Sequence, residues 1–117
     1  MLVPEPLSIC QRRENAVHRL TPIGELDLAT APRLERAFDA VLNDRGAETI
    51  VVDLTELSFF DSTGVHLLLR MHAACHDGDR LRIINGSRAV ARVLDLAGVC
   101  ARLPIIARDQ DPVPGSR

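Results

Sequence analysis

The sequence predicts an α/β domain in which a small mixed sheet of four or five strands is flanked by three or four helices. Strand-like apolar segments alternate with helical segments after an initial hairpin, a pattern typical of layered α/β proteins. The 117 residues suffice for one hydrophobic core, and no internal repeat divides them. We therefore expect a single domain over residues 1–107. The polar, proline-containing residues 108–117 are expected to be a flexible tail.

The strands are predicted from short apolar runs bounded by turn residues. Residues 7–24 are typical of a hairpin that turns around Glu14 and Asn15. Pro22 cannot donate a hydrogen bond to a sheet ladder, so we expect it at an edge or a bulge. Three later runs predict a strand buried on both faces, a further strand and a short edge strand: "ETIVVDL", "RLRIIN" and "LPII".

Three helices are predicted from signals at their ends. The first has Thr30 as its candidate N-cap and Gly46 as a left-handed terminator. The second follows the sequence "DSTG", and we expect the turn at residues 77–79 to end it. The third has Ser87 as its candidate cap and Gly98 as its terminator.

Composition excludes several classes of function. The net charge of −2 and an aromatic content of 3% give no basic surface and few stacking groups for nucleic acid. No apolar run approaches the length of a membrane span, and no signal peptide is recognisable. The three widely spaced cysteines, Cys10, Cys75 and Cys100, are expected to be free thiols. We therefore expect a cytoplasmic protein that binds neither nucleic acid nor membrane.

The segment Asp61-Ser62-Thr63-Gly64 separates two strongly apolar runs, and its residues alone allow two interpretations. Asp61 or Ser62 could cap the following helix, with Gly64 permitting tight packing. Alternatively, Ser62 or Thr63 could accept a phosphate, because a helix N-terminus stabilises negative charge.

The second helix carries apolar residues on two faces. One face is assigned to the core and consists of Leu67, Leu68, Met71 and Cys75. The other face lies close to Ser62 and is predicted to bind a partner, although scattered surface hydrophobic residues are a simpler alternative. The residues of this second face are Val65, His66, Leu69 and Ala73.

Catalytic and metal-binding constellations are weak. His72, Cys75 and His76 are possible metal ligands, but Cys75 belongs to the core face, so we expect no metal and no cofactor. Asp61 could be imagined as an acceptor of an acyl phosphate. The related receiver chemistry relies on a lysine, and all 14 cationic residues here are arginines. The sequence therefore predicts a protein that is not an enzyme.

Three stretches together resemble one family: "GELDLATAP" (24–32), "IVVDLTELSFFDSTGVHLLL" (50–69) and "VARVLDLAGV" (90–99). In this order and spacing they are similar to the STAS domain of bacterial anti-sigma factor antagonists. The resemblance extends over roughly residues 7 to 106. It implies a STAS-like mixed sheet flanked by helices.

The resemblance also implies a function by partner switching. The unphosphorylated form would bind an anti-sigma factor with a histidine-kinase-like ATPase fold and so free the sigma factor. That partner would phosphorylate Ser62, and a PP2C-type phosphatase would reverse the modification. Asp27, Asp61, Thr63 and Gly64 match family positions around the acceptor. The alternative function is a constitutive STAS interaction or scaffold subunit that phosphorylation does not regulate.

Overall fold

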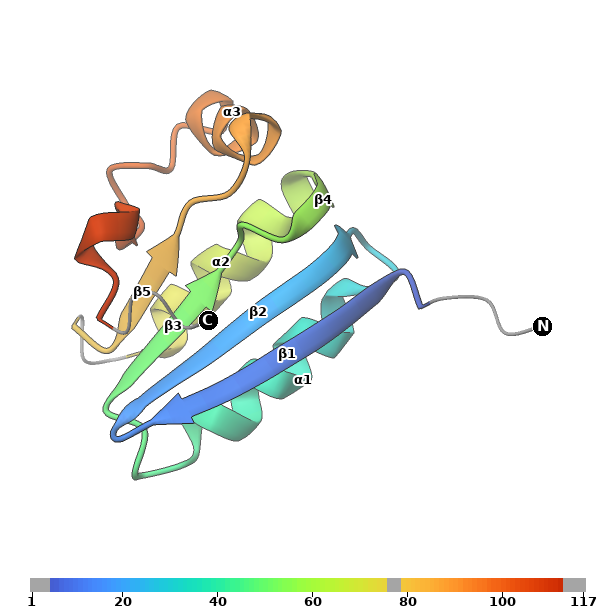
Figure 1. The fold of residues 1–117 in the computed structure, drawn as a ribbon. Helices are drawn as coiled ribbons and strands as arrows, with labels where there is room; N and C mark the ends of the chain where they lie inside the picture. Colours follow the sequence, from blue (N-terminus) through green and yellow to red (C-terminus); the bar gives the residue numbers. More distant parts are fainter. Residues whose placement is uncertain (1–4, 76–78, 113–117) are drawn as a thin grey trace.

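The computed structural model describes residues 5–75 and 79–112, which form one mixed sheet and its covering helices (Figure 1). The elements are β1 (Leu7–Glu14), β2 (Val17–Leu26), α1 (Ala31–Leu42), β3 (Thr49–Asp53), β4 (Leu57–Phe60), α2 (Ser62–Ala74), β5 (Leu81–Ile84), α3 (Arg88–Leu96), β6 (Ile105–Ile106) and the 3-10 helix η1 (Arg108–Gln110). The predicted fold class is confirmed. The described sheet has six strands rather than four or five, because the run before Asp61 is itself a strand, β4.

β2 organises the sheet. It pairs antiparallel with β1, and the hairpin turns at Asn15, whose φ is 56°. β3 pairs in parallel with the first half of β2, and β4 pairs in parallel with its last residues. β5 and β6 continue the sheet in parallel beyond β3. Since β2 to β6 run in one direction, the starts of α1, α2 and α3 lie towards one end of the domain.

Pro22 lies inside β2, opposite Ile9 of β1. The ladder between β2 and β3 ends at Leu20, and the one between β2 and β4 begins at Gly24. Pro22 therefore falls where β2 has no parallel partner, and the register shift comes two residues later, between Gly24 and Glu25. No ladder hydrogen bond to a parallel strand is therefore required from the Pro22 nitrogen, which is why a proline is tolerated inside β2.

The helix ends agree with most of the predictions. Ser87 caps α3 by accepting a hydrogen bond from the Val90 backbone N–H, and Gly98 follows the helix with a φ of +70°. The prediction that Gly46 terminates α1 was wrong. The helix already ends at Leu42, and Gly46 has no positive φ. The turn predicted after α2 falls largely on residues 76–78, outside the described residues.

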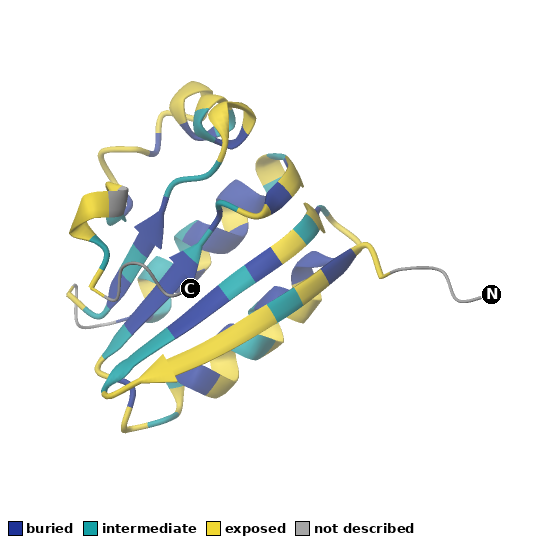
Figure 2. Cartoon of the chain, in the orientation of Figure 1, coloured by how far each residue is buried: buried dark blue, intermediate teal, exposed yellow. Residues whose placement is uncertain are grey.

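The main core lies between the sheet and the helices α1 and α2, which run side by side behind it (Figures 1 and 2). The predicted core face of α2 is confirmed, because its four residues are all buried. α1 packs its apolar face, formed by Leu34, Phe38 and Val41, against the same core. This packing fixes α2, and with it Asp61 and Ser62, on the sheet.

Leu68→Ala is expected to lower the free energy of unfolding by about 2–5 kcal/mol, because Leu68 is fully buried in the main core. Leu28→Ala is the matched control, since it removes the same atoms from a side chain that is 79% exposed. Urea denaturation of both variants measures the difference. Equal stabilities would show that Leu68 does not contribute to the core as described.

The opposite face of the sheet carries a buried ion cluster. Arg19 is flanked in β2 by a core residue, Leu20, so its side chain points away from α1 and α2. Its guanidinium donates to Asp53 Oδ2 at 3.0 Å and to both carboxylate oxygens of Asp111 at 2.5 Å. Asp111 follows η1, so the ordered chain continues beyond residue 107, where the flexible tail was predicted to begin. Residues 113–117 lie outside the described residues.

Candidate functional site

The start of α2 is built around Asp61, the residue after β4. Asp61 is the N-cap, and its Oδ1 accepts a hydrogen bond from the Thr63 backbone N–H at 3.0 Å. Its backbone oxygen accepts from the Gly64 N–H at 3.0 Å. Ser62 is the first residue of the helix and is exposed, and its hydroxyl has no hydrogen-bond partner among the described residues. Asp61 therefore performs the capping, and the Ser62 hydroxyl is not needed for it.

Asp27 lies beside Asp61 because of the strand register. Leu26 of β2 pairs with Phe60 of β4, so the two aspartates follow paired residues of neighbouring parallel strands. Such strands are about 4.8 Å apart. Asp27 Oδ1 accepts hydrogen bonds from the backbone N–H groups of Ala29 at 3.0 Å and Thr30 at 3.1 Å. Each aspartate thus shapes the turn into a helix, and together they give this end of the domain an acidic character.

Thr30 is the N-cap of α1, as predicted, but its side chain does not cap the helix. Its hydroxyl instead donates to the backbone oxygen of Glu25 at 2.7 Å and accepts from the Asp27 N–H at 3.0 Å. These bonds draw the loop after β2 against the end of that strand. The loop that carries Asp27 is therefore held in place by the Asp27 carboxylate and by the Thr30 hydroxyl.

Of the residues predicted to face a partner, one is buried and another is half-buried. Val65 is only 4% exposed and belongs to the main core, so its assignment to a partner surface was wrong. Leu69 is half-buried and packs against the core, which also limits its availability. The physical reason is that α2 has α1 on one side and α3 on another, so it is covered on more than one face. His66 and Ala73 are exposed, as predicted.

Gly64 is buried where β4 turns into α2. A Cβ atom at this position would lie 2.4 Å from the Phe60 ring. The absence of a side chain thus lets the end of β4 pack directly on the first turn of α2. This contact agrees with the tight packing expected at Gly64 and gives this glycine a structural role.

Gly64→Ala is expected to destabilise the domain by about 1–3 kcal/mol, because the new methyl group overpacks the Phe60 contact. Helix propensity alone predicts the opposite sign, a gain of about 1 kcal/mol. Chemical denaturation therefore distinguishes the two effects. Adding Phe60→Leu should recover part of the loss, and a Gly64→Ala variant as stable as the original would contradict the described contact.

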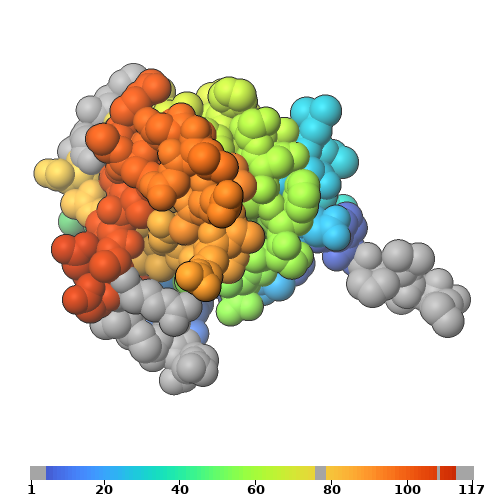
Figure 3. All heavy atoms as spheres, turned by 90° about the horizontal axis from the view of Figure 1, so that it is seen from above, coloured from blue at the N-terminus to red at the C-terminus, as the bar shows by residue number. Residues whose placement is uncertain are grey.

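Exposed apolar residues next to Ser62 were missed by sequence reasoning. Leu28, immediately after Asp27, is 79% exposed, and Phe59, two residues before Asp61, is 46% exposed. Figure 3 shows that the loop after β2, the junction of β4 with α2, and α3 lie side by side on one surface. Asp27, Leu28, Phe59, Asp61 and Ser62 are called the Ser62 face below.

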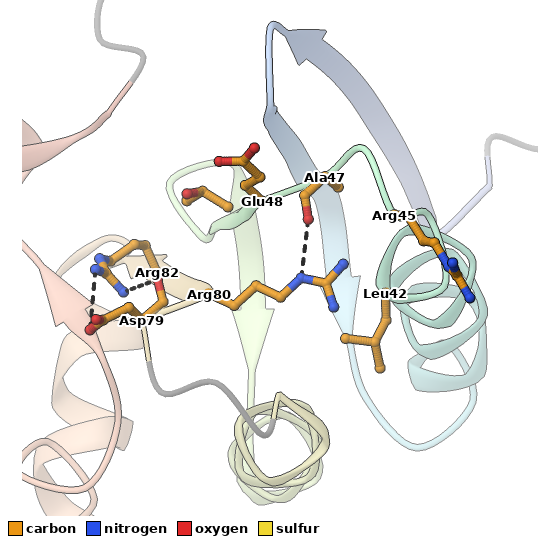
Figure 4. Close-up of a pocket in the computed structure, with 8 residues that line it drawn as sticks. Leu42, Arg45, Ala47, Glu48, Asp79, Arg80 and Arg82 are labelled. Atoms are coloured by element: carbon orange, nitrogen blue, oxygen red, sulfur yellow. Dashed lines mark hydrogen bonds and ion pairs between the residues drawn. The ribbon is translucent and has the colours of Figure 1, made fainter.

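A hollow of about 700 Å³ lies at the other end of the sheet, where β3 and β5 begin (Figure 4). Three arginines line it, but they do not converge on one point. Arg80 donates to the backbone oxygen of Ala47 at 3.1 Å, Arg82 turns towards Asp79, and Arg45 points away. The hollow therefore lacks the arrangement of an anion site and leaves the Ser62 face as the candidate functional site.

The cysteines and histidines add no second site. Cys10 and Cys100 are exposed and Cys75 is buried, and none of the three forms a disulfide within the described residues. Partial burial and a hydrogen bond to Asp95 raise the pKa of the Cys100 thiol above its ordinary value. Within residues 5–75 and 79–112, no three potential ligands are grouped to hold a metal ion. His76, one of the possible ligands, lies outside the described residues.

Comparison with known proteins agrees with this architecture. The anti-sigma-B factor antagonist of Staphylococcus aureus is 34% identical over 77 residues, which are 65% of this chain and 70% of that protein. The crystal structure of an anti-sigma factor antagonist from Mycobacterium paratuberculosis matches with a TM-score of 0.79 at 24% identity, covering 90% of this chain and 89% of that one. SpoIIAA of Bacillus in its phosphorylated form matches with a TM-score of 0.64 at 20% identity, covering 86% and 90%.

The fold and the site define a class of small α/β domains that display a hydroxyl at the start of a helix. The STAS domain family matches residues 11–111. The chain belongs to the STAS domain family, as its resemblance predicted. No helix among the described residues has both the length and the apolar character needed to cross a membrane.

Proposed function

We propose that this chain is an anti-sigma factor antagonist, which binds an anti-sigma factor and thereby frees the sigma factor that it holds. Relatives that are 32–34% identical carry the name anti-sigma-B factor antagonist. The structural observation that carries the proposal is the exposed, unbonded hydroxyl of Ser62 at a helix start that Asp61 already caps.

The same geometry supports regulation by phosphorylation of Ser62. Because Asp61 supplies the cap, a phosphate on Ser62 would remove no hydrogen bond from the described fold. The α2 N-terminus would favour the added charge by about 0.3–1 kcal/mol. In this proposal the anti-sigma factor has a histidine-kinase-like ATPase fold and modifies Ser62, and a PP2C-type phosphatase removes the phosphate. The site is a substrate for these enzymes and carries out no catalysis of its own.

An acyl phosphate on Asp61 is less well supported than a phosphoserine. The Asp61 carboxylate accepts the Thr63 N–H and is therefore already engaged in capping α2. The chain also has no lysine that could assist such chemistry. A phosphorylated protein whose label survives mild base would fit Ser62 as the acceptor.

The partner surface is centred on the Ser62 face rather than on Val65 and Leu69. Leu28 and Phe59 supply the exposed apolar area, and Asp27 and Asp61 supply charge around the hydroxyl. Apolar side chains that are surrounded by polar groups are typical of the centre of a protein interface.

A binding assay tests this proposal directly. The chain is titrated with purified anti-sigma factors of the histidine-kinase-like class from the same genome, and we expect one of them to bind. Leu28→Asp should weaken that binding by about 10-fold or more, because it places a charge in an apolar contact. Ala40→Asp, which adds the same charge at an exposed position of α1, is the control. Absence of binding to every such factor would contradict the proposed function.

A further inference from the structure

The outer side of α3 carries arginines that have no counter-charge. Arg88 and Arg92 are exposed, and neither makes a hydrogen bond or an ion pair with its side chain among the described residues. Arg13, Arg33 and Arg70, by contrast, each pair with a carboxylate. Arg36 and Arg45, on α1 and in the loop after it, are of the unpaired kind and also lack described partners. The cations of α3 are therefore available for a partner outside this chain.

These arginines form a stripe with an exposed leucine. Residues 88, 92 and 96 are spaced by four, so they lie along one side of the helix, while Val90 and Leu94 are buried on the other. Leu96 at the end of the stripe is 77% exposed. Arg88, Arg92 and Leu96 are called the α3 stripe below.

One carboxylate of α3, Asp95, offsets part of the charge of the α3 stripe. Asp95 is exposed, and its Oδ1 accepts a hydrogen bond from the Cys100 thiol at 3.5 Å. No ion pair joins it to Arg92 or Arg88. The described part of α3 therefore keeps an excess of positive charge, in a protein whose overall charge is −2.

The α3 stripe lies on an element that adjoins the Ser62 face. α3 contacts β4 and α2, the two elements that meet at Asp61 and Ser62. Figure 3 shows α3 directly beside the junction of β4 with α2 on the same surface. A protein that covers the Ser62 face can therefore extend over α3 in the same complex.

We propose that the α3 stripe is a second part of the docking surface and binds an acidic, partly apolar segment of the anti-sigma factor. This inference rests on the proposed function. Carboxylates on that segment would pair with Arg88 and Arg92, whose guanidinium groups can each bind a carboxylate through two hydrogen bonds. An apolar side chain next to these carboxylates would cover Leu96.

The charges of the whole surface then determine how the partner is oriented. The Ser62 face is acidic through Asp27 and Asp61, whereas the α3 stripe is basic. A partner with the complementary order of charges fits in one orientation, and the reverse orientation brings like charges together. Exposed charges of this kind act mainly on the association rate and make it sensitive to salt.

The test compares two double variants that remove equal charge. Arg88→Gln with Arg92→Gln removes the cations of the α3 stripe. The matched control is Arg36→Gln with Arg45→Gln, which removes two exposed arginines that also lack described partners but lie on α1 and in the loop after it. Association and dissociation rates with the anti-sigma factor are measured between 50 and about 300 mM salt, where screening becomes strong.

We expect the α3 variant to bind about 10-fold more weakly at low salt, mostly through slower association, and to show a flatter salt dependence. The control should stay within about twofold of the original protein. Equal affinity and equal salt dependence for all three proteins would overturn the assignment of α3 while leaving the proposed function intact. A concentration-dependent dimer of the original chain that Arg88→Gln with Arg92→Gln abolishes would also overturn it, because a second copy would then occupy the α3 stripe.

Discussion

Phosphorylated Ser62 is expected to lower the affinity for the anti-sigma factor by about 100-fold or more while leaving the fold unchanged. A phosphoserine adds roughly −1.5 to −2 charges at pH 7. Within the domain, the α2 N-terminus favours this charge and Asp61 opposes it, so the two effects tend to offset each other. A partner that covers Leu28 and Phe59 with apolar side chains must instead remove water from the phosphate. This removal is costly even if cations of the partner meet Asp27 and Asp61, because those cations are already paired.

Two variants separate charge from the loss of the hydroxyl. Ser62→Asp should weaken binding only in part, since it has one charge and fewer acceptor oxygens than a phosphate. Ser62→Ala should bind as the original protein does and resist inactivation by the kinase. Calorimetry of the modified and unmodified proteins measures the effect. Equal affinities would favour the constitutive scaffold subunit over the switch, and amide spectra altered across the whole domain would contradict an electrostatic mechanism.

Arg19→Met is expected to lower the free energy of unfolding by about 3–5 kcal/mol. The Arg19 side chain is only 7% exposed and binds two carboxylates that are themselves largely buried. Removal of the guanidinium leaves Asp53 and Asp111 facing each other without a cation, which is the costly result of breaking a buried ion pair. Methionine keeps most of the apolar stem, so the loss of charge dominates over the loss of packing.

Arg13→Met is the matched control for this prediction. It breaks the exposed ion pair between Arg13 and Asp44, which is expected to contribute less than about 1 kcal/mol. Asp111→Asn added to Arg19→Met should restore part of the stability, because Asp53 keeps its hydrogen bonds to Thr55. If Arg19→Met lowered the free energy of unfolding no more than Arg13→Met does, the ion pairs of Arg19 would not hold Asp111 to the sheet as described.

The sequence predicted those elements whose signals are local. The cap at Asp61, the helix end at Gly98 and the core face of α2 all follow from the residues of a single segment. Val65 was misassigned because one helix's pattern does not show how many neighbours cover that helix. The single-helix pattern assumes one buried face, and α2 has more than one.

Long-range contacts account for the rest. Arg19 and Asp111 are 92 residues apart, and an isolated arginine in an alternating strand gives no sign of its partner. β4 has only four residues, so the sequence pattern did not distinguish it as a strand from the loop before α2. Leu28 carried a usable signal, since it is a large apolar residue in the turn between Asp27 and Thr30. Its exposure, however, depends on how Asp27 and Thr30 fold that turn.

Release of the sigma factor is the activity that the proposed function requires. A complex of a labelled sigma factor with its anti-sigma factor is formed first, and this chain is then added while fluorescence anisotropy reports the bound fraction. The unmodified chain should free the sigma factor as its concentration approaches that of the complex. The chain phosphorylated on Ser62 should leave the complex intact. Failure of the unmodified chain to release the sigma factor would contradict the proposed function, and equal release by both forms would contradict the switch at Ser62.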